Sequence, residues 1–123
     1  MWKMVDLRGF ARPPEFKGVD SEWVDYRFKM LAVCELLELA DLMRRAETYP
    51  QEIRLDETEP EVRRRSAVLY SILVQTCTNK ALSIVRLVRQ GNGFEAWRRM
   101  CREFAPRTAT RHAAMLTGVL TPK

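Results

Sequence analysis

The side chains that most often do chemistry in proteins are scarce in this sequence. Its cysteines, Cys34, Cys77 and Cys101, are 43 and 24 residues apart, and the one histidine is His112. A zinc site usually takes about four such ligands in close pairs, so we expect no metal and no other cofactor. Cys101 and His112 are close in sequence, but Cys101 falls on a predicted apolar helix face. We therefore interpret it as a small buried side chain rather than a nucleophile.

No other motif in the chain indicates catalysis. There is no Gly-x-Ser-x-Gly, no phosphate-binding Walker loop and no Gly-x-Gly-x-x-Gly, and the run Gly91-Asn92-Gly93 is typical of a turn. We predict that the protein is not an enzyme and has no small-molecule substrate. Charged residues interrupt every apolar run, so we also predict no membrane span. Three cysteines cannot all pair, and the first residues lack the apolar core of a signal peptide, which predicts an intracellular, cytoplasmic protein.

The length and composition fit one compact domain. The chain has 123 residues, of which 46% are hydrophobic and 30% charged. Residues 1–19 contain Pro13, Pro14 and turn signals, and they are predicted to form an extended leader. Residues 20–123 are predicted to form a single all-α domain, a compact bundle of about five helices. An acidic stretch at about 47–60 is predicted to be an exposed linker within it.

Apolar residues recur at steps of three or four along five stretches. The first predicts one long helix from about residue 20 to residue 46, with Trp23 on its core stripe and a second apolar set, including Val24 and Phe28, that widens the stripe. Further helices are predicted at about 61–77, 79–90, 94–104 and 109–120. The helix at 94–104 has the clearest pattern. Trp97 and the other apolar residues of this stretch lie on one side of the helix, and the arginines lie on the opposite side.

Charge is segregated along the sequence. Residues 20–61 contain 12 acidic and 5 basic residues, a net charge of −7, whereas residues 62–123 contain 2 acidic and 12 basic residues, a net charge of +10. This pattern predicts head-to-tail self-association or attraction of the basic half to phosphate. The alternative is that the two halves pack together and neutralise one another. The candidate assembly or RNA surface comprises Arg63, Arg64, Arg65, Arg98, Arg99, Arg102, Arg107 and Arg111.

Two runs resemble a known family. The first is Pro13-Pro14-Glu15-Phe16-Lys17-Gly18 followed by Trp23-Val24-Asp25-Tyr26-Arg27-Phe28-Lys29; the second is Gly93-Phe94-Glu95-Ala96-Trp97-Arg98-Arg99-Met100 followed by Phe104-Ala105-Pro106-Arg107-Thr108. In their order and separation these runs resemble the Gag domain of long-terminal-repeat retrotransposons, over residues 13 to 122.

The resemblance implies a helical domain like a retroviral or retrotransposon capsid lobe, which multimerises into a shell around the element's RNA. Trp23, Phe28, Trp97, Phe104 and Leu116 match the family's core positions, and the resemblance implies that they pack the fold. It implies no catalytic residue. The chain has no zinc knuckle of the Cys-x-x-Cys type and no Asp-Thr/Ser-Gly protease signature. It is therefore interpreted as a polyprotein fragment or a shortened, host-adopted copy.

Two other functions are compatible with the sequence. One is nucleic-acid binding without assembly, through the basic C-terminal half. The other is a peptide-binding adaptor, as in host-adopted Gag lobes, with an apolar groove between helices. In that case Trp2, Phe10 and Phe16 of the leader could fill the groove as a lid.

Overall fold

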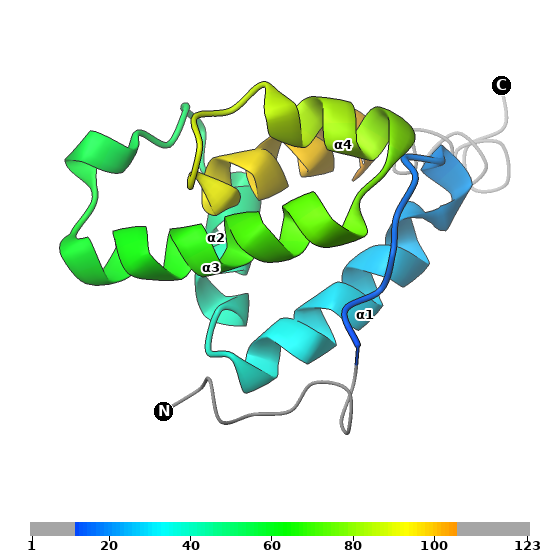
Figure 1. Cartoon of the computed structure of the whole chain (residues 1–123), viewed down its shortest axis with the longest axis horizontal. Coiled ribbons are helices and arrows are strands. Elements are labelled where there is room, and N and C mark those ends of the chain that lie inside the picture. The colour runs from blue at the N-terminus through cyan, green and yellow to red at the C-terminus, as the bar shows by residue number, and fades with distance from the viewer. Residues whose placement is uncertain (1–11, 106–123) are drawn as a thin grey trace, which may run out of the picture.

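The structure, a computed structural model, describes residues 12–105 and is mostly helical (Figure 1). The α-helices of this part are α1 (Trp23–Leu36), α2 (Ala40–Thr48), α3 (Pro60–Thr76), α4 (Asn79–Arg86) and a fifth helix at residues 93–105. Two single 3₁₀ turns, Asp20–Glu22 and Leu55–Glu57, precede α1 and α3. The described chain has five helices and no strand, which confirms the predicted all-α class. The predicted helix at 109–120 lies outside these residues. The same is true of Trp2, Phe10, Arg107, Arg111, His112 and Leu116.

The first predicted helix is wrong, because two helices occupy its range. The chain turns between α1 and α2, where Glu38 has a left-handed backbone with φ of 60°. The carbonyl oxygen of Cys34 accepts hydrogen bonds from the amides of Leu37 and Leu39, at 3.1 and 2.9 Å, which closes the end of α1. The turn directs Leu39 into the core, where it is buried. No glycine or proline marks this turn, so the apolar periodicity continues across it unbroken.

The predicted helices at about 61–77, 79–90 and 94–104 agree with the structure to within a few residues. Helix α3 begins at Pro60, whose fixed φ and missing N–H suit a first helical turn. Thr76 ends α3, and α4 follows after the extended residues Cys77 and Thr78. The fifth helix begins beyond the turn at Gly91.

The end of the leader is built into the domain. Residues 12–19, the described part of the predicted leader, form no helix and run beside α1 (Figure 1). The amide of Phe16 donates to the carbonyl oxygen of Thr76 at 3.1 Å, and the carbonyl oxygen of Phe16 accepts from the amide of Thr78 at 3.0 Å. These two bonds form a parallel bridge between Phe16 and Cys77. The Phe16 side chain is buried, so this leader residue fills the core of its own chain.

Aromatic rings from distant parts of the sequence meet in the core. Phe16 stacks on Tyr26 with ring centroids 4.4 Å apart and meets Phe104 edge-on at 5.0 Å. Trp23 and Trp97 lie 5.4 Å apart. Each such pair contributes about 0.5–1.5 kcal/mol beyond the area that it buries. The packing roles expected for Trp23, Trp97 and Phe104 agree with this cluster.

Phe28 does not belong to the core, so its predicted role is wrong. Its side chain is 72% exposed. Trp23, Tyr26 and Met30 define the buried side of α1, and a residue five positions after Trp23 points to the opposite side. The second apolar set, which also includes Leu31, Leu36 and Leu39, is therefore divided: Leu31 and Leu39 are buried in the core, whereas Val24, Phe28 and Leu36 are exposed.

The helices of the described chain are short or interrupted by charge. None of them is both long enough and apolar enough to cross a bilayer.

Candidate functional site

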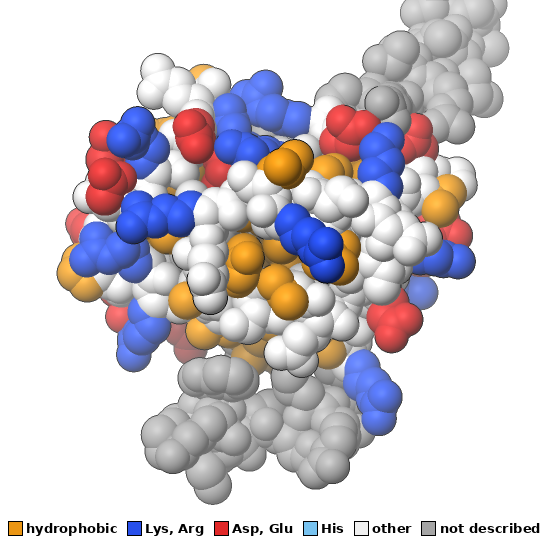
Figure 2. Space-filling view, turned by 45° about the horizontal axis from the view of Figure 1, so that its top comes forward, with side chains coloured by type: hydrophobic (Ala, Val, Ile, Leu, Met, Phe, Trp, Pro, Cys, Tyr) orange, Lys and Arg blue, Asp and Glu red, His pale blue; other side chains and the backbone are white. Residues whose placement is uncertain are grey.

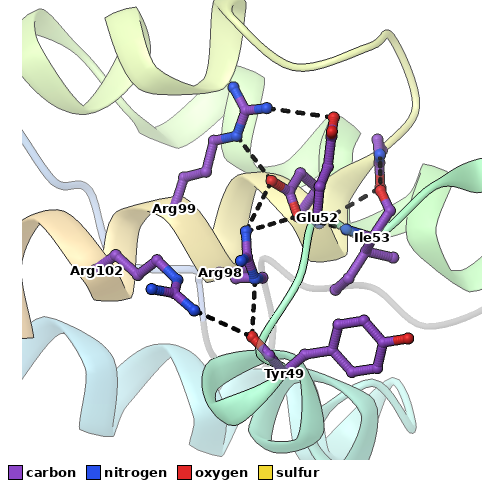
Figure 3. A network of polar contacts seen from close by, with 8 residues as sticks. Tyr49, Glu52, Ile53, Arg98, Arg99 and Arg102 are labelled. Atoms are coloured by element: carbon purple, nitrogen blue, oxygen red, sulfur yellow. Dashed lines mark hydrogen bonds and ion pairs between the residues drawn. The ribbon is translucent and has the colours of Figure 1, made fainter.

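The arginines of the fifth helix, predicted to form an assembly or RNA surface, do not all lie on an open surface. Arg98 is 8% exposed and is a buried residue, so its placement on an open surface is wrong. Arg99 is half-buried, and only Arg102 is exposed. The cause is the segment at residues 49–54, which lies over the side of the helix that the periodicity left for solvent (Figure 3). A helix pattern identifies which residues share a side, but it does not show what covers that side.

A buried carboxylate organises this contact (Figure 3). Glu95 is 1% exposed, and its side chain accepts hydrogen bonds from the amide of Ile53 at 2.9 Å, from Arg98 at 3.1 Å and from Arg99 at 2.8 Å. The carbonyl oxygen of Tyr49 accepts from Arg98 at 3.0 Å. Each buried charge is therefore paired or hydrogen-bonded, which is the condition for burying it at acceptable cost. The cluster has a structural role, and its arginines are occupied.

The turn before the fifth helix completes the same contact. The side-chain amide nitrogen of Asn92 donates to the carbonyl oxygen of Ile53 at 2.9 Å, while its side-chain oxygen accepts from the amide of Glu95 at 3.4 Å. Asn92 thus acts as an N-cap and holds the linker at once. The run Gly91-Asn92-Gly93 indicates the turn, but no local pattern indicates the bond from Asn92 to the linker. The predicted acidic linker is otherwise exposed, apart from half-buried Glu47, Ile53, Leu55 and Thr58.

The arginine triplet at the start of α3 is engaged with neighbouring groups. Arg64 and Arg65 both pair with Glu61, one turn before them, and Arg65 also approaches Glu38 at 3.7 Å. Arg63 donates to the carbonyl oxygen of Thr58. Salt bridges at such exposed positions contribute little to stability. They nevertheless offset the positive charge at this helix N-terminus, which the helix dipole disfavours.

The two oppositely charged halves of the sequence meet within the domain. Arg99 pairs with Glu52 at 3.4 Å, and Arg65 pairs with Glu38. Around the edge of the face in Figure 2, acidic and basic side chains lie beside one another. The intramolecular neutralisation that the sequence analysis left open therefore accounts for part of the charge segregation.

Basic residues without an acidic partner lie elsewhere. Arg86 and Arg89 are exposed at and beyond the end of α4, and neither forms an ion pair within residues 12–105. Acidic residues are absent from the whole stretch 62–94. Leu87, between the two arginines, is 75% exposed. The end of α4 is therefore a better candidate for contact with phosphate than the predicted arginines of the fifth helix.

The outer side of α1 is the clearest feature without an internal role. Val24, Phe28 and Leu36 are 59%, 72% and 59% exposed, and Ala32 between them is also exposed. These residues are four positions apart, so they follow one another along the helix. We call this set, Val24, Phe28, Ala32 and Leu36, the α1 stripe. Large apolar side chains gathered in this way are typical of interaction sites.

A polar contact on the inner side of α1 fixes its position. Glu47, at the end of α2, accepts two hydrogen bonds from Arg27 at 2.7 and 2.8 Å and a third from the indole nitrogen of Trp97 at 3.0 Å. The contact joins three helices and satisfies the one polar atom of a buried tryptophan. Glu47 was predicted to lie in the linker but belongs to α2, and no local signal identifies its partners.

A hollow of about 450 Å³ lies between α2, the linker and α3. Its apolar lining includes Leu42, Ile53 and Phe94, and Tyr49 lies at its edge with 47% exposure. Charged residues of both signs line it as well. The hollow is large enough for a few side chains of a bound peptide.

The cysteines lie in surroundings that suppress thiol chemistry. All three are unpaired and buried. Burial raises the thiol pKa of Cys34 to about 12 and that of Cys77 to about 11, and it raises that of Cys101 further. The reactive form of a cysteine is the thiolate, so these groups are poor nucleophiles. Within the described range, no three His, Cys, Asp or Glu side chains are grouped to hold a metal ion.

Comparisons with known proteins do not extend this picture. No family model, no curated protein and no solved structure matches the chain.

Proposed function

We propose that this chain is a structural, Gag-like module of a retrotransposon, which self-associates in a capsid-like assembly that encloses the element's RNA. The observation that carries the proposal is the α1 stripe, with Phe28 at 72% exposure at its middle. Exposure of such side chains to water is unfavourable, and covering them with another protein surface removes that cost. The sequence resemblance supports the Gag assignment, and the all-α fold is compatible with it.

The RNA part of the proposal rests on the end of α4. Arg86 and Arg89 are free of carboxylate partners within the described residues, and the surrounding stretch 62–94 has no acidic residue. Contacts of this kind are electrostatic, non-specific and strongly dependent on salt. The buried Arg98 is no longer part of the proposed surface.

Light scattering coupled to gel filtration tests self-association. We expect the mean mass of the particle to rise with protein concentration across a range from about 1 µM to 1 mM, the range expected of a weak interface. A constant monomer mass across that range, at both low and moderate salt, would refute the assembly function.

Fluorescence anisotropy with a labelled single-stranded RNA tests the second part. The affinity for RNA should fall steeply as the salt concentration rises. A double substitution of Arg86 and Arg89 by Gln should make the slope of log affinity against log salt shallower, by the amount expected for the loss of about two phosphate contacts. Substitution of Arg64 and Arg65 by Gln is the matched control, because both side chains are paired with Glu61. A salt-independent affinity, or an equal effect of both substitutions, would contradict this assignment.

The alternative function is a host-adopted Gag lobe that binds a peptide without forming a shell. The hollow beside Tyr49 and Phe94 is the observation that favours it. A monomer at all concentrations that binds an apolar peptide, with binding lost on Tyr49→Ala, would support this alternative over assembly.

A further inference from the structure

We propose that the α1 stripe is covered by the α1 stripe of a second copy of this chain, with the two helices antiparallel around a two-fold axis close to Phe28. This inference rests on the proposed self-association and specifies its contact.

The composition of α1 supports a partner on its outer side. Trp23, Tyr26 and Met30 on the inner side are buried in the core. The outer side nevertheless carries Val24 and Phe28, which makes the helix apolar on both sides. A helix with this composition is typically covered on both sides, whereas a surface helix presents polar residues to solvent.

The charges beside the stripe select an antiparallel arrangement. Asp25 and Lys29 lie on the same flank of the stripe, one turn apart, and their charged groups are 3.1 Å from each other. If two α1 helices pack antiparallel with the axis near residues 27 and 28, Asp25 of each copy lies opposite Lys29 of the other. A parallel pair brings opposite flanks together, so Asp25 would face the flank that carries Arg27, which Glu47 of its own chain already neutralises. Charge complementarity therefore favours the antiparallel pair.

The opposite flank tolerates the same arrangement. Arg27 lies near the proposed axis, so two guanidinium groups approach each other there. Each is already neutralised by Glu47 of its own chain through bonds of 2.7 and 2.8 Å. The approach of like charges is therefore offset within each copy.

The contact is small, which fits one contact among several in an assembly. Phe28 buries on the order of 150–250 Å² when fully covered, and the other stripe residues are smaller. The total falls below the 1,200 Å² or so of standard stable interfaces. We expect a weak, concentration-dependent pair, with the same patch used by both copies.

Disulfide formation tests whether residue 28 lies close to the two-fold axis. A Phe28→Cys substitution places two thiols close to each other across the axis, so mild oxidation should convert most of the protein into a covalent dimer. The native cysteines should form few disulfides under these conditions, because they are buried and their thiol pKa values are raised. Leu87→Cys, at a position that is 75% exposed on another helix end, is the matched control and should yield severalfold less dimer. Equal yields from both variants would overturn the proposal.

A charge-swap series tests the register. Phe28→Lys should raise the dissociation constant of self-association at least about tenfold. Asp25→Lys alone should weaken association, and the double variant Asp25→Lys with Lys29→Asp should restore it. If the wild type associates and every variant has the same mean particle mass as the wild type, the proposed contact is wrong although self-association stands. If the wild type is a monomer, both proposals fail. If Phe28→Lys lowers the melting temperature without changing the mass, a segment of the same chain covers the stripe, and the proposal is wrong.

Discussion

Replacing the buried Glu95 by glutamine tests whether the cluster of Glu95, Arg98 and Arg99 stabilises the fold. Glu95→Gln keeps the size and shape of the side chain but removes the charge that pairs with Arg98 and Arg99, at 3.1 and 2.8 Å. Arg98 is 8% exposed, so its charge remains buried after the change. Breaking a buried ion pair from one side usually costs about 3–5 kcal/mol.

We expect a value near the lower end of that range. The carbonyl oxygen of Tyr49 still accepts a hydrogen bond from Arg98 at 3.0 Å, and the new glutamine oxygen can still accept from the amide of Ile53. A loss of about 3 kcal/mol in the free energy of unfolding corresponds to a fall of about 10 °C in the melting temperature of a domain of this size.

Urea and thermal unfolding, followed by circular dichroism, measure the change. Glu52→Gln is the control, because Glu52 pairs with Arg99 at 3.4 Å but its side chain is 60% exposed. It should cost less than about 1 kcal/mol. A double-mutant cycle of Glu95→Gln with Arg98→Met should give a coupling energy above about 1 kcal/mol. If Glu95→Gln costs no more than Glu52→Gln, the cluster is not the structural contact that we describe.

Three further predictions follow from the core. Gly93→Ala should destabilise the protein by about 1–3 kcal/mol, measured by urea unfolding, because a Cβ there would lie 2.5 Å from the backbone nitrogen of Tyr70; an unchanged midpoint would contradict this close approach. Trp97→Phe should cost about 2 kcal/mol or more in thermal unfolding, since it removes ring volume and the hydrogen bond to Glu47. Glu47→Gln should cost less, because the amide oxygen can still accept that bond; a loss well below about 2 kcal/mol for Trp97→Phe would contradict the packing role of the indole ring. The three thiols should resist a disulfide reagent in the native state, and stability should fall as the pH rises above about 9. Their raised pKa values keep them protonated while the unfolded thiols ionise, so the unfolded chain binds fewer protons there; rapid labelling of the native protein at pH 8 would refute this.

The helical class and most helix positions could be predicted from the sequence. Proline, glycine and the spacing of apolar residues identified α3, α4 and the fifth helix with ends correct to within a few residues. These signals are local, because helix ends depend on backbone groups within one turn. The break at Glu38 was missed because it depends on the burial of Leu39, which is a tertiary contact.

The functional surfaces were less predictable. Phe28 and Arg98 each lie in the environment opposite to the one that their residue type suggests. The aromatic ring of Phe28 is 72% exposed, and the guanidinium group of Arg98 is buried. Periodicity assigned Phe28 to a widened core stripe and Arg98 to the solvent side. Neither assignment could be corrected without knowing which segment packs against each helix.

The sequence by itself determined that the chain is helical, which residues share a helix side, and that positive charge accumulates after residue 61. Only the tertiary structure decided which of those sides are covered. The linker lies over the arginines of the fifth helix because Glu95 and Asn92 bind its backbone, and the outer side of α1 stays open because no described segment reaches it. The physical reason is that a helix side is defined by neighbours within a turn, whereas its burial is decided by segments about 40 residues away, whose approach no local pattern records.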